Sequence, residues 1–131
     1  MTTEDPYNPL VRDCFENPAH AGDLPRGYAD VRQVVVTDPG SGSQLQLFAG
    51  IEHGKISALR FRAWGCPHLL AAAELYCREH EGLELAASGD VDVTDMLGRV
   101  SAPVAKTGRL LLIHDAARKL AIGAGIRDKD R

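Results

Sequence analysis

Cys66 is the residue whose type and setting best fit a chemical role. It stands between Gly65 and Pro67, where the pattern predicts that a strand ends and a helix begins. The positive end of a helix dipole favours a thiolate, which is the form of cysteine that binds metal or attacks sulfur. His68 could add an imidazole to the same metal ion, or it could simply cap the helix or lie on its surface. The alternative for Cys66 is a buried and inert thiol, which is common in folded proteins.

The other cysteines do not extend this site. Cys14 and Cys77 fall on apolar faces of predicted helices, so we expect both in the core. Three cysteines are an odd number, and their wide spacing argues against a disulfide framework and against a zinc site built from closely spaced pairs. Free thiols of this kind are typical of a reducing compartment.

Further motifs give little support for catalysis. His53 is expected in an exposed hairpin turn, His20 in a loop, and His80 and His114 on helices without an evident partner. The glycine-rich segment at 39–43 precedes a strand instead of a helix, so it lacks the amide array of a phosphate-binding loop. The sequence contains no serine elbow, Walker lysine or paired-carboxylate motif. We therefore do not expect an enzyme.

Length and charge restrict the remaining classes. A chain of 131 residues that is 44% hydrophobic predicts one domain over 1–131, with a core spanning about 7–124. Its formal net charge of -3 does not suggest nucleic acid as a partner. It has no run of the roughly 20 apolar residues that cross a bilayer, and its polar first residues do not resemble a signal peptide. A cytoplasmic location is the expectation, with no membrane partner.

The elements that would position Cys66 follow from periodicity. Strands are predicted at 31–37, 44–52 and 55–64, with the last two joined as a hairpin through His53 and Gly54. Helices are predicted at 8–16, 68–80, 90–100 and about 106–124, with Asp92 or Thr94 capping the third. Strands followed by separate helices predict an α+β sandwich in which a three-stranded antiparallel sheet packs against helices.

Four segments together resemble the NifU/IscU-type iron–sulfur cluster assembly scaffold family. Residues 13–22 resemble the early helix and Asn-Pro turn of these scaffolds, and 59–66 resemble the strand that leads to their central cysteine. The alanine-rich helix at 70–73 and the close of the chain at 115–122 are also similar. The resemblance covers about 7–122. It implies the NifU/IscU-like sandwich, with a cluster or metal site at one end.

The resemblance also identifies where this chain departs from the family. The family holds a cluster with three cysteines, and Cys66 aligns with the central one. Ser41 and Ser43 align with the family's Cys-Gly-Asp loop, and the third cysteine aligns near Leu110, which Arg109 precedes. Iron clusters usually take four soft thiolate ligands, so one cysteine should not retain a cluster. No stably bound cofactor is expected, although the family implies iron or an iron–sulfur cluster.

Three functions remain open at this point. The first is a degenerate scaffold of iron–sulfur assembly that handles iron or sulfur weakly, or binds partners, through Cys66. The resemblance implies a cysteine desulfurase or a chaperone as partner, although the segment that a chaperone reads in some relatives is reduced to 102–104. The second is a cluster-free protein-binding module that keeps the scaffold fold. The third is a thiol protein that accepts sulfur on Cys66 from a desulfurase.

Overall fold

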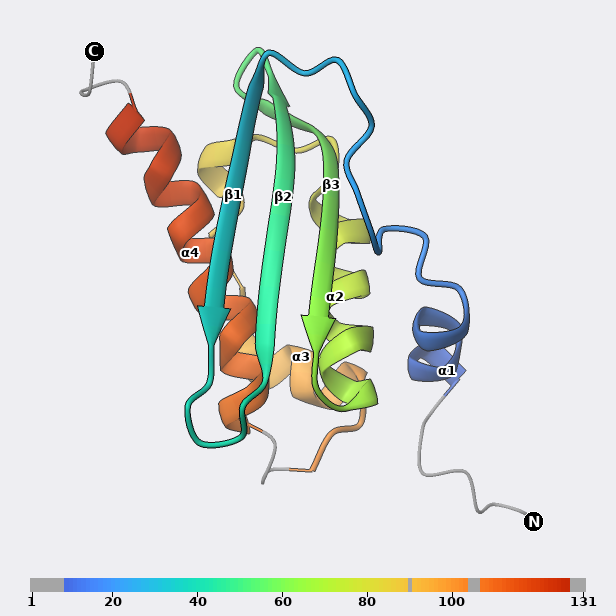
Figure 1. The fold of residues 1–131 in the computed structure, drawn as a ribbon. Coiled ribbons are helices and arrows are strands. Elements are labelled where there is room, and N and C mark those ends of the chain that lie inside the picture. Colours follow the sequence, from blue (N-terminus) through green and yellow to red (C-terminus); the bar gives the residue numbers. More distant parts are fainter. Residues whose placement is uncertain (1–8, 90, 104–106, 128–131) are drawn as a thin grey trace.

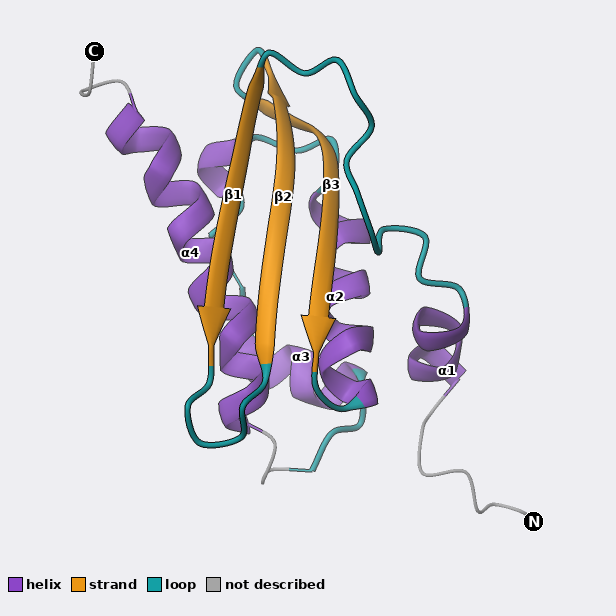
Figure 2. Ribbon diagram, viewed as in Figure 1, coloured by secondary structure: helices purple, strands orange, loops and turns teal. Residues whose placement is uncertain are grey.

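The protein is a three-stranded antiparallel sheet with helices packed on one face, as Figure 1 shows for the computed structural model. The structure describes residues 9–89, 91–103 and 107–127. Figure 2 marks the helices and strands by type. In chain order the elements are α1 (Pro9–Glu16), β1 (Asp30–Thr37), β2 (Gln44–Glu52), β3 (Lys55–Trp64), α2 (Pro67–His80), the short 3-10 helix η1 (Leu85–Ala87), α3 (Val93–Arg99) and α4 (Thr107–Arg127).

The predicted α+β sandwich and its three strands are confirmed. The strands run in the order β1-β2-β3, and β1 begins one residue earlier than the pattern indicated. The β2–β3 hairpin turns through His53 and Gly54, whose φ angles are 56° and 78°. Glycine adopts such an angle without a steric penalty, which explains the sharp connection. His53 is exposed in this turn, as expected.

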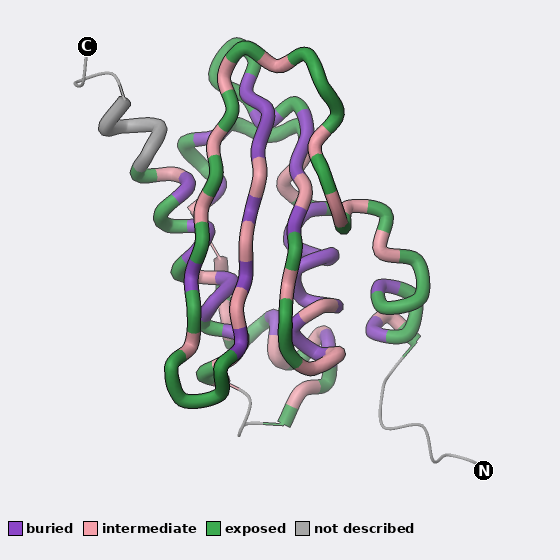
Figure 3. Tube along the Cα trace, in the orientation of Figure 1, coloured by how far each residue is buried: buried purple, intermediate pink, exposed green. Residues whose placement is uncertain are grey.

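The core lies between the sheet and the helices α2 and α4. On β2 the side chains of Leu45, Leu47 and Ala49 are fully buried, while the residues between them are only partly covered. This alternation arises because successive strand residues point to opposite faces. Figure 3 shows buried residues along β2, α2 and part of β3, whereas β1 is almost entirely exposed or intermediate. One face of the sheet therefore carries the core.

The helix boundaries follow local chemistry, with some differences from expectation. Asp92 is the N-cap of α3, and its carboxylate accepts a hydrogen bond from the Asp95 amide at 3.0 Å. Pro67 opens α2, which the pattern had started at His68, because proline lacks an amide hydrogen and fits the first helical position. α4 extends to Arg127, beyond the predicted end, and η1 was not predicted. The predicted starts at Asn8, Asp90 and Lys106 lie outside the described residues.

A buried polar cluster joins the segment after α1 to α2. Glu74, on α2, is fully buried, and its carboxylate accepts a hydrogen bond from the His20 amide at 2.9 Å. The ring of His20 bridges two carboxylates, with Nδ1 at 2.7 Å from Glu74 and Nε2 at 3.0 Å from Glu81. Arg78 donates to Glu74 at 2.9 Å and to Asp13 of α1 at 3.0 Å. Because buried carboxylates are stable only when they are paired, this cluster fixes the position of α1 against α2.

The structure corrects two expectations about histidines. His20 lies in a loop as predicted, but it is an anchor between two distant segments. His80, for which the sequence indicated no partner, stacks on Tyr76 with ring centroids 4.2 Å apart and contacts the Tyr76 carbonyl at 3.0 Å. The sequence separation of 54 residues between His20 and Glu74 explains why no local pattern revealed the pair.

The substitution Glu74→Ala should destabilise the fold by about 2–4 kcal/mol, because it leaves the amide of His20 and the guanidinium of Arg78 without their buried acceptor. Urea denaturation followed by circular dichroism measures the change. Glu16→Ala is the matched control, since Glu16 forms an exposed pair with Arg12 and should have almost no effect. Equal stability of the two variants would show that the buried cluster does not hold the fold.

Glu81 predicts an acid dependence of stability. Burial raises its pKa, but hydrogen bonds from the Leu59 amide, His20 and Arg60 outweigh burial and hold the pKa below its usual value of 4.5. A carboxyl group with a lowered pKa in the folded state stabilises the fold above its unfolded pKa. That stability is lost as the pH falls below 4.5 and through the lower folded value. In urea titrations from neutral to acid pH, Glu81→Gln should therefore lose less stability than the natural protein. Parallel pH curves for the two proteins would contradict this.

Candidate functional site

Cys66 lies at the start of α2, directly after β3. It is the N-cap residue, with φ -81° and ψ 164°, and its carbonyl accepts the amides of Leu69 and Leu70 at 3.0 and 3.2 Å. Its side chain makes no capping hydrogen bond and is partly exposed. The thiol is therefore at the positive end of a 14-residue helix, the setting that favours a thiolate.

A turn between β1 and β2 carries Ser41 and Ser43 beside Asp38. The hydroxyl of Ser41 donates to the Asp38 carboxylate at 2.7 Å, and the two serine hydroxyls are 2.9 Å apart. The backbone closes the same turn, because the amides of Asp38 and Gly42 donate to the Ser43 and Asp38 carbonyls, both at 2.8 Å. Ser41 is exposed, whereas Ser43 is buried. The turn is thus a compact array of hard oxygen donors.

Gly65 brings this turn next to the cysteine. A methyl group added at Gly65 would lie 3.0 Å from the Ser43 hydroxyl and 2.9 Å from Cδ2 of Leu69. Only glycine allows such a close approach without displacement of the neighbours. The first residue of β2, Gln44, pairs with the last residue of β3, Trp64. The sheet therefore holds the turn before β2 beside the end of β3. Cys66 follows at the next position in the chain.

The structure separates the two candidates for the third ligand position. Leu110 is fully buried in the core. Arg109 is partly exposed at the start of α4 and lies close enough to Asp38 to influence its carboxyl group. The hydrogen bond from Ser41 holds the pKa of Asp38 below its usual value, and the nearby Arg109 lowers that pKa further. The end of the molecule that holds Cys66 therefore also carries an anion, a cation and two hydroxyl groups.

His68 is in the first turn of α2, and its side chain is buried instead of lying on the surface. Its exposed fraction is 4%, and α2 as a whole is buried along nine residues. The surface or capping position that the sequence indicated for His68 is wrong, because α2 is sandwiched between the sheet and other helices. No three metal-binding side chains come together among the described residues, and His68 belongs to no such group.

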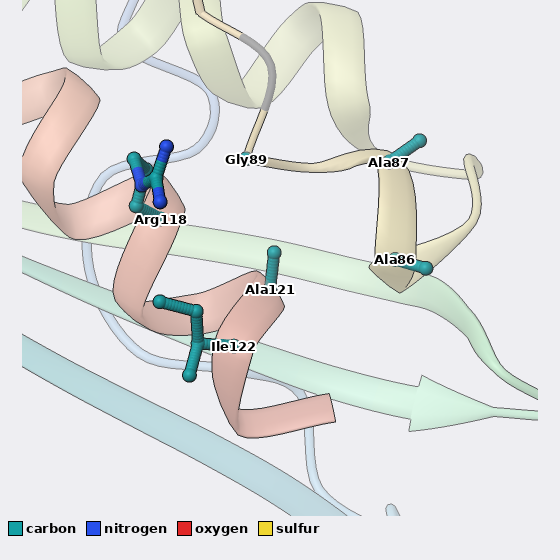
Figure 4. Close-up of a pocket in the computed structure, with 6 residues that line it drawn as sticks. All are labelled: Ala86, Ala87, Gly89, Arg118, Ala121 and Ile122. Atoms are coloured by element: carbon teal, nitrogen blue, oxygen red, sulfur yellow. The ribbon is translucent and has the colours of Figure 1, made fainter. Parts of the chain in front are cut away.

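The surface has one hollow beside Cys66 and another away from it, next to α4. Beside Cys66, α1 and Pro67 line a mainly apolar hollow of about 190 Å³, with the half-exposed Phe15 on its wall. A second hollow of about 390 Å³ lies between α4 and the segment from η1 to Gly89, as shown in Figure 4. Its lining consists of small or apolar residues and Arg118. Neither hollow gathers the donors that a metal would need.

The family model described as the NifU-like N terminal domain matches residues 6–124. The chain belongs to this family. It is 28% identical over 112 residues to "Iron sulfur cluster assembly protein 1" of Trachipleistophora hominis, covering 86% of this chain and 81% of that protein. It is 27% identical over 124 residues to "Iron sulfur cluster assembly protein 2, mitochondrial" of Saccharomyces cerevisiae, covering 93% and 76% of the two chains.

A solved NifU-like protein from Brucella abortus has the same fold. Its N-terminal structure superposes with a TM-score of 0.67 at 18% sequence identity, covering 91% of this chain and 94% of that chain. The resemblance inferred from the four sequence segments is therefore confirmed at the level of family and fold. The described helices include none that is long and apolar enough to cross a membrane.

The donors present do not fit an iron–sulfur cluster. A cluster requires several soft thiolates, whereas Cys66 is the one thiol beside this turn in the described residues. The Ser41 hydroxyl is hydrogen-bonded to the Asp38 carboxylate and to the Ser43 hydroxyl, so both serine hydroxyl groups already have hard oxygen partners. Arg109 adds a cation, which repels a metal ion. The described residues at this end of the fold therefore offer one thiolate beside hard oxygen donors and a cation.

Asp38 is the site residue that the sequence reasoning missed. An Asp followed by Pro, Gly and Ser is a common signal that the carboxylate caps a turn. That signal predicts a local hydrogen bond to the backbone, which the Gly40 amide supplies at 3.3 Å. The approach of Arg109 depends on how α4 packs against the sheet and has no local signal.

The three cysteines should differ in reactivity. Cys14 and Cys77 are buried, and burial raises the pKa of each thiol. Cys66 is partly exposed at a helix N-terminus, so it should react first with iodoacetamide in the folded protein at neutral pH. Mass mapping of a time course gives the order.

In urea all three cysteines should react at similar rates, which is the control for intrinsic reactivity. If Cys66 were as protected as Cys14 and Cys77 in the folded protein, it could neither bind metal nor accept sulfur.

Proposed function

We propose that this protein acts in iron–sulfur cluster assembly as a degenerate scaffold, which binds a partner and handles iron or sulfur only transiently through Cys66. The observation that carries the proposal is the combination at one end of the fold. Cys66, which the sequence aligns with the family's central cysteine, lies at a helix N-terminus. The turn of Ser41 and Ser43 lies beside the adjoining Gly65, with Arg109 near Asp38 of that turn. Such a site can present one thiolate, but it cannot enclose a metal.

Sulfur handling requires only the thiolate that is present. In the proposed step the thiolate of Cys66 attacks the outer sulfur of a persulfide on a donor such as a cysteine desulfurase. The sulfur–sulfur bond of the donor breaks, the inner sulfur leaves as a thiolate, and Cys66 becomes the new persulfide. The proton stays on the transferred sulfur, so the step needs no further reductant or oxidant. The helix N-terminus favours this step because it stabilises the anionic nucleophile.

Iron handling would be weak on the same grounds. Asp38 supplies a carboxylate that could contact iron beside the thiolate, but its oxygen already accepts the Ser41 hydroxyl. The guanidinium of the neighbouring Arg109 would compete with iron for the negative charge of Asp38. A metal held by one or two protein ligands exchanges readily, since closed protein sites usually supply about four. Retention of a cluster would need ligands from another molecule.

A cluster-free protein-binding module is the second candidate function. It is favoured by the apolar hollow beside Pro67, whose wall includes Phe15, exposed to 49%. That surface could bind a partner without any role for the thiol. The partners that the family suggests are assembly proteins, including a desulfurase or a chaperone. A cytoplasmic location stays a prediction.

Zinc binding tests whether ligand loss explains the site. The natural protein should retain no stoichiometric zinc after dialysis, whereas Ser41→Cys combined with Ser43→Asp and Arg109→Cys should retain about one zinc per chain. Metal analysis and cobalt absorption spectra give the readout. The matched control replaces Leu110 with cysteine instead of Arg109, and it should not bind because position 110 lies in the core.

Two outcomes would contradict the proposed site. Stoichiometric zinc in the natural protein that disappears in Cys66→Ser would show that a closed metal site exists already. Failure of the triple variant to bind zinc, while its circular dichroism is unchanged, would show that the three positions do not converge on one metal.

A further inference from the structure

The outer edge of β1 is an open sheet edge. β1 pairs only with β2, and residues 31–36 make no other backbone hydrogen bond among the described residues. The strand contains three consecutive valines, no proline and no bulge. Native sheets usually protect a long edge of this kind, because its unpaired amides and carbonyls are a template for another strand.

The opposite edge of the same sheet is protected in detail. Along β3, Ile56 exchanges hydrogen bonds with the segment after α2, since its amide donates to the Leu83 carbonyl at 2.8 Å and its carbonyl accepts from Gly82 at 2.7 Å. Phe61 is bonded by its amide to the His20 carbonyl and by its carbonyl to the Gly22 amide, both at 2.9 Å. Loops thus cover β3, so the absence of any such cover on β1 is specific to that edge.

A groove with basic walls runs beside this open edge. It has a volume of about 420 Å³ and lies between the end of β1 and one side of α4, where Figure 1 shows α4 passing next to β1. The α4 side carries His114, Asp115, Arg118 and Lys119. His114 lies 3.6 Å from Asp115, whereas Arg118 and Lys119 are exposed and form no ion pair with a described residue. The wall therefore has an excess of positive charge facing the groove.

We propose that the edge of β1 binds an extended acidic segment of a partner protein, which adds a fourth strand to the sheet. The backbone of the added strand would pair with β1. Because strand side chains alternate between faces, one set would point to the helix side and meet Arg118 and Lys119. The other set would lie on the open face beside Val31 and Val35, which are exposed to 52% and 43%. The partner segment thus alternates acidic with apolar β-branched residues.

A second copy of this chain fits the edge less well. Antiparallel pairing of two β1 strands about a two-fold axis would put both α4 helices on the same side of the joined sheet. Both copies would then bring Arg118 and Lys119 to that same side, and like charges across an interface disfavour association. The side chains that β1 would offer on that side are Asp30, Arg32, Val34 and Val36, and Asp30 lies 3.6 Å from Arg32 of its own strand.

Binding of a designed strand tests the proposal. The probe is an acetylated and amidated peptide of about eight residues, a common strand length, that alternates glutamate with valine and threonine. Addition to ¹⁵N-labelled protein at up to about 1 mM should shift the amides of residues 31–36 and slow their hydrogen exchange. The same peptide methylated on alternate backbone nitrogens keeps its charge but cannot donate along the edge, and it should bind at least about tenfold more weakly.

Charge reversal tests the groove. Arg118→Glu combined with Lys119→Glu should weaken binding by about tenfold, whereas Arg12→Glu combined with Arg26→Glu makes the same change of net charge elsewhere and should leave affinity nearly unchanged. The proposal is overturned if no amide of β1 shifts, if the methylated peptide binds equally well, or if both double variants weaken binding alike. A concentration-dependent dimer that Val35→Lys abolishes would assign the edge to a second copy and also overturn it. Neither result depends on Cys66, so it leaves the assembly proposal to its own test.

Discussion

The close contact between Gly65 and Ser43 is the constraint on which the candidate site depends. Any side chain at position 65 would press against the Ser43 hydroxyl and Leu69, so those two side chains would have to shift. The contact exists because β2 begins where the antiparallel β3 ends, with Gln44 opposite Trp64. The turn between β1 and β2 and the connection from β3 to α2 therefore lie side by side, next to Cys66.

The fold around this contact is held by interactions that do not involve the thiol. The core between the sheet, α2 and α4 fixes the direction of α2, and the buried Glu74 cluster fixes α1 beside it. The chemistry at the end of the sheet can change without loss of this frame. Here hydroxyl groups, a carboxylate and a guanidinium lie at the same end of the fold as a single cysteine. Under the proposed function, the fold persists although the ligands of its site are replaced.

The sequence predicted the parts of the molecule that depend on local patterns. Val34–Val36 and the alternation along β2 predicted strands, and Asp92 predicted the cap of α3, because these signals act over a few residues. The burial of His68 and the bridge from His20 to Glu74 were not predictable, since they depend on which faces meet after folding. For the same reason alignment could not decide between Arg109 and Leu110, whereas helix packing places Leu110 in the core and Arg109 near Asp38.

Anaerobic reconstitution of the natural protein with ferrous iron, sulfide and a thiol reductant tests the central claim most directly. After desalting, iron and sulfide are assayed per chain and the visible absorption spectrum is recorded. One partly exposed cysteine predicts iron and sulfide far below one cluster per chain and no lasting absorption of a cluster. About two iron and two sulfide per chain, with visible absorption that survives desalting and is lost in Cys66→Ala, would show that the protein retains a cluster and would contradict the account.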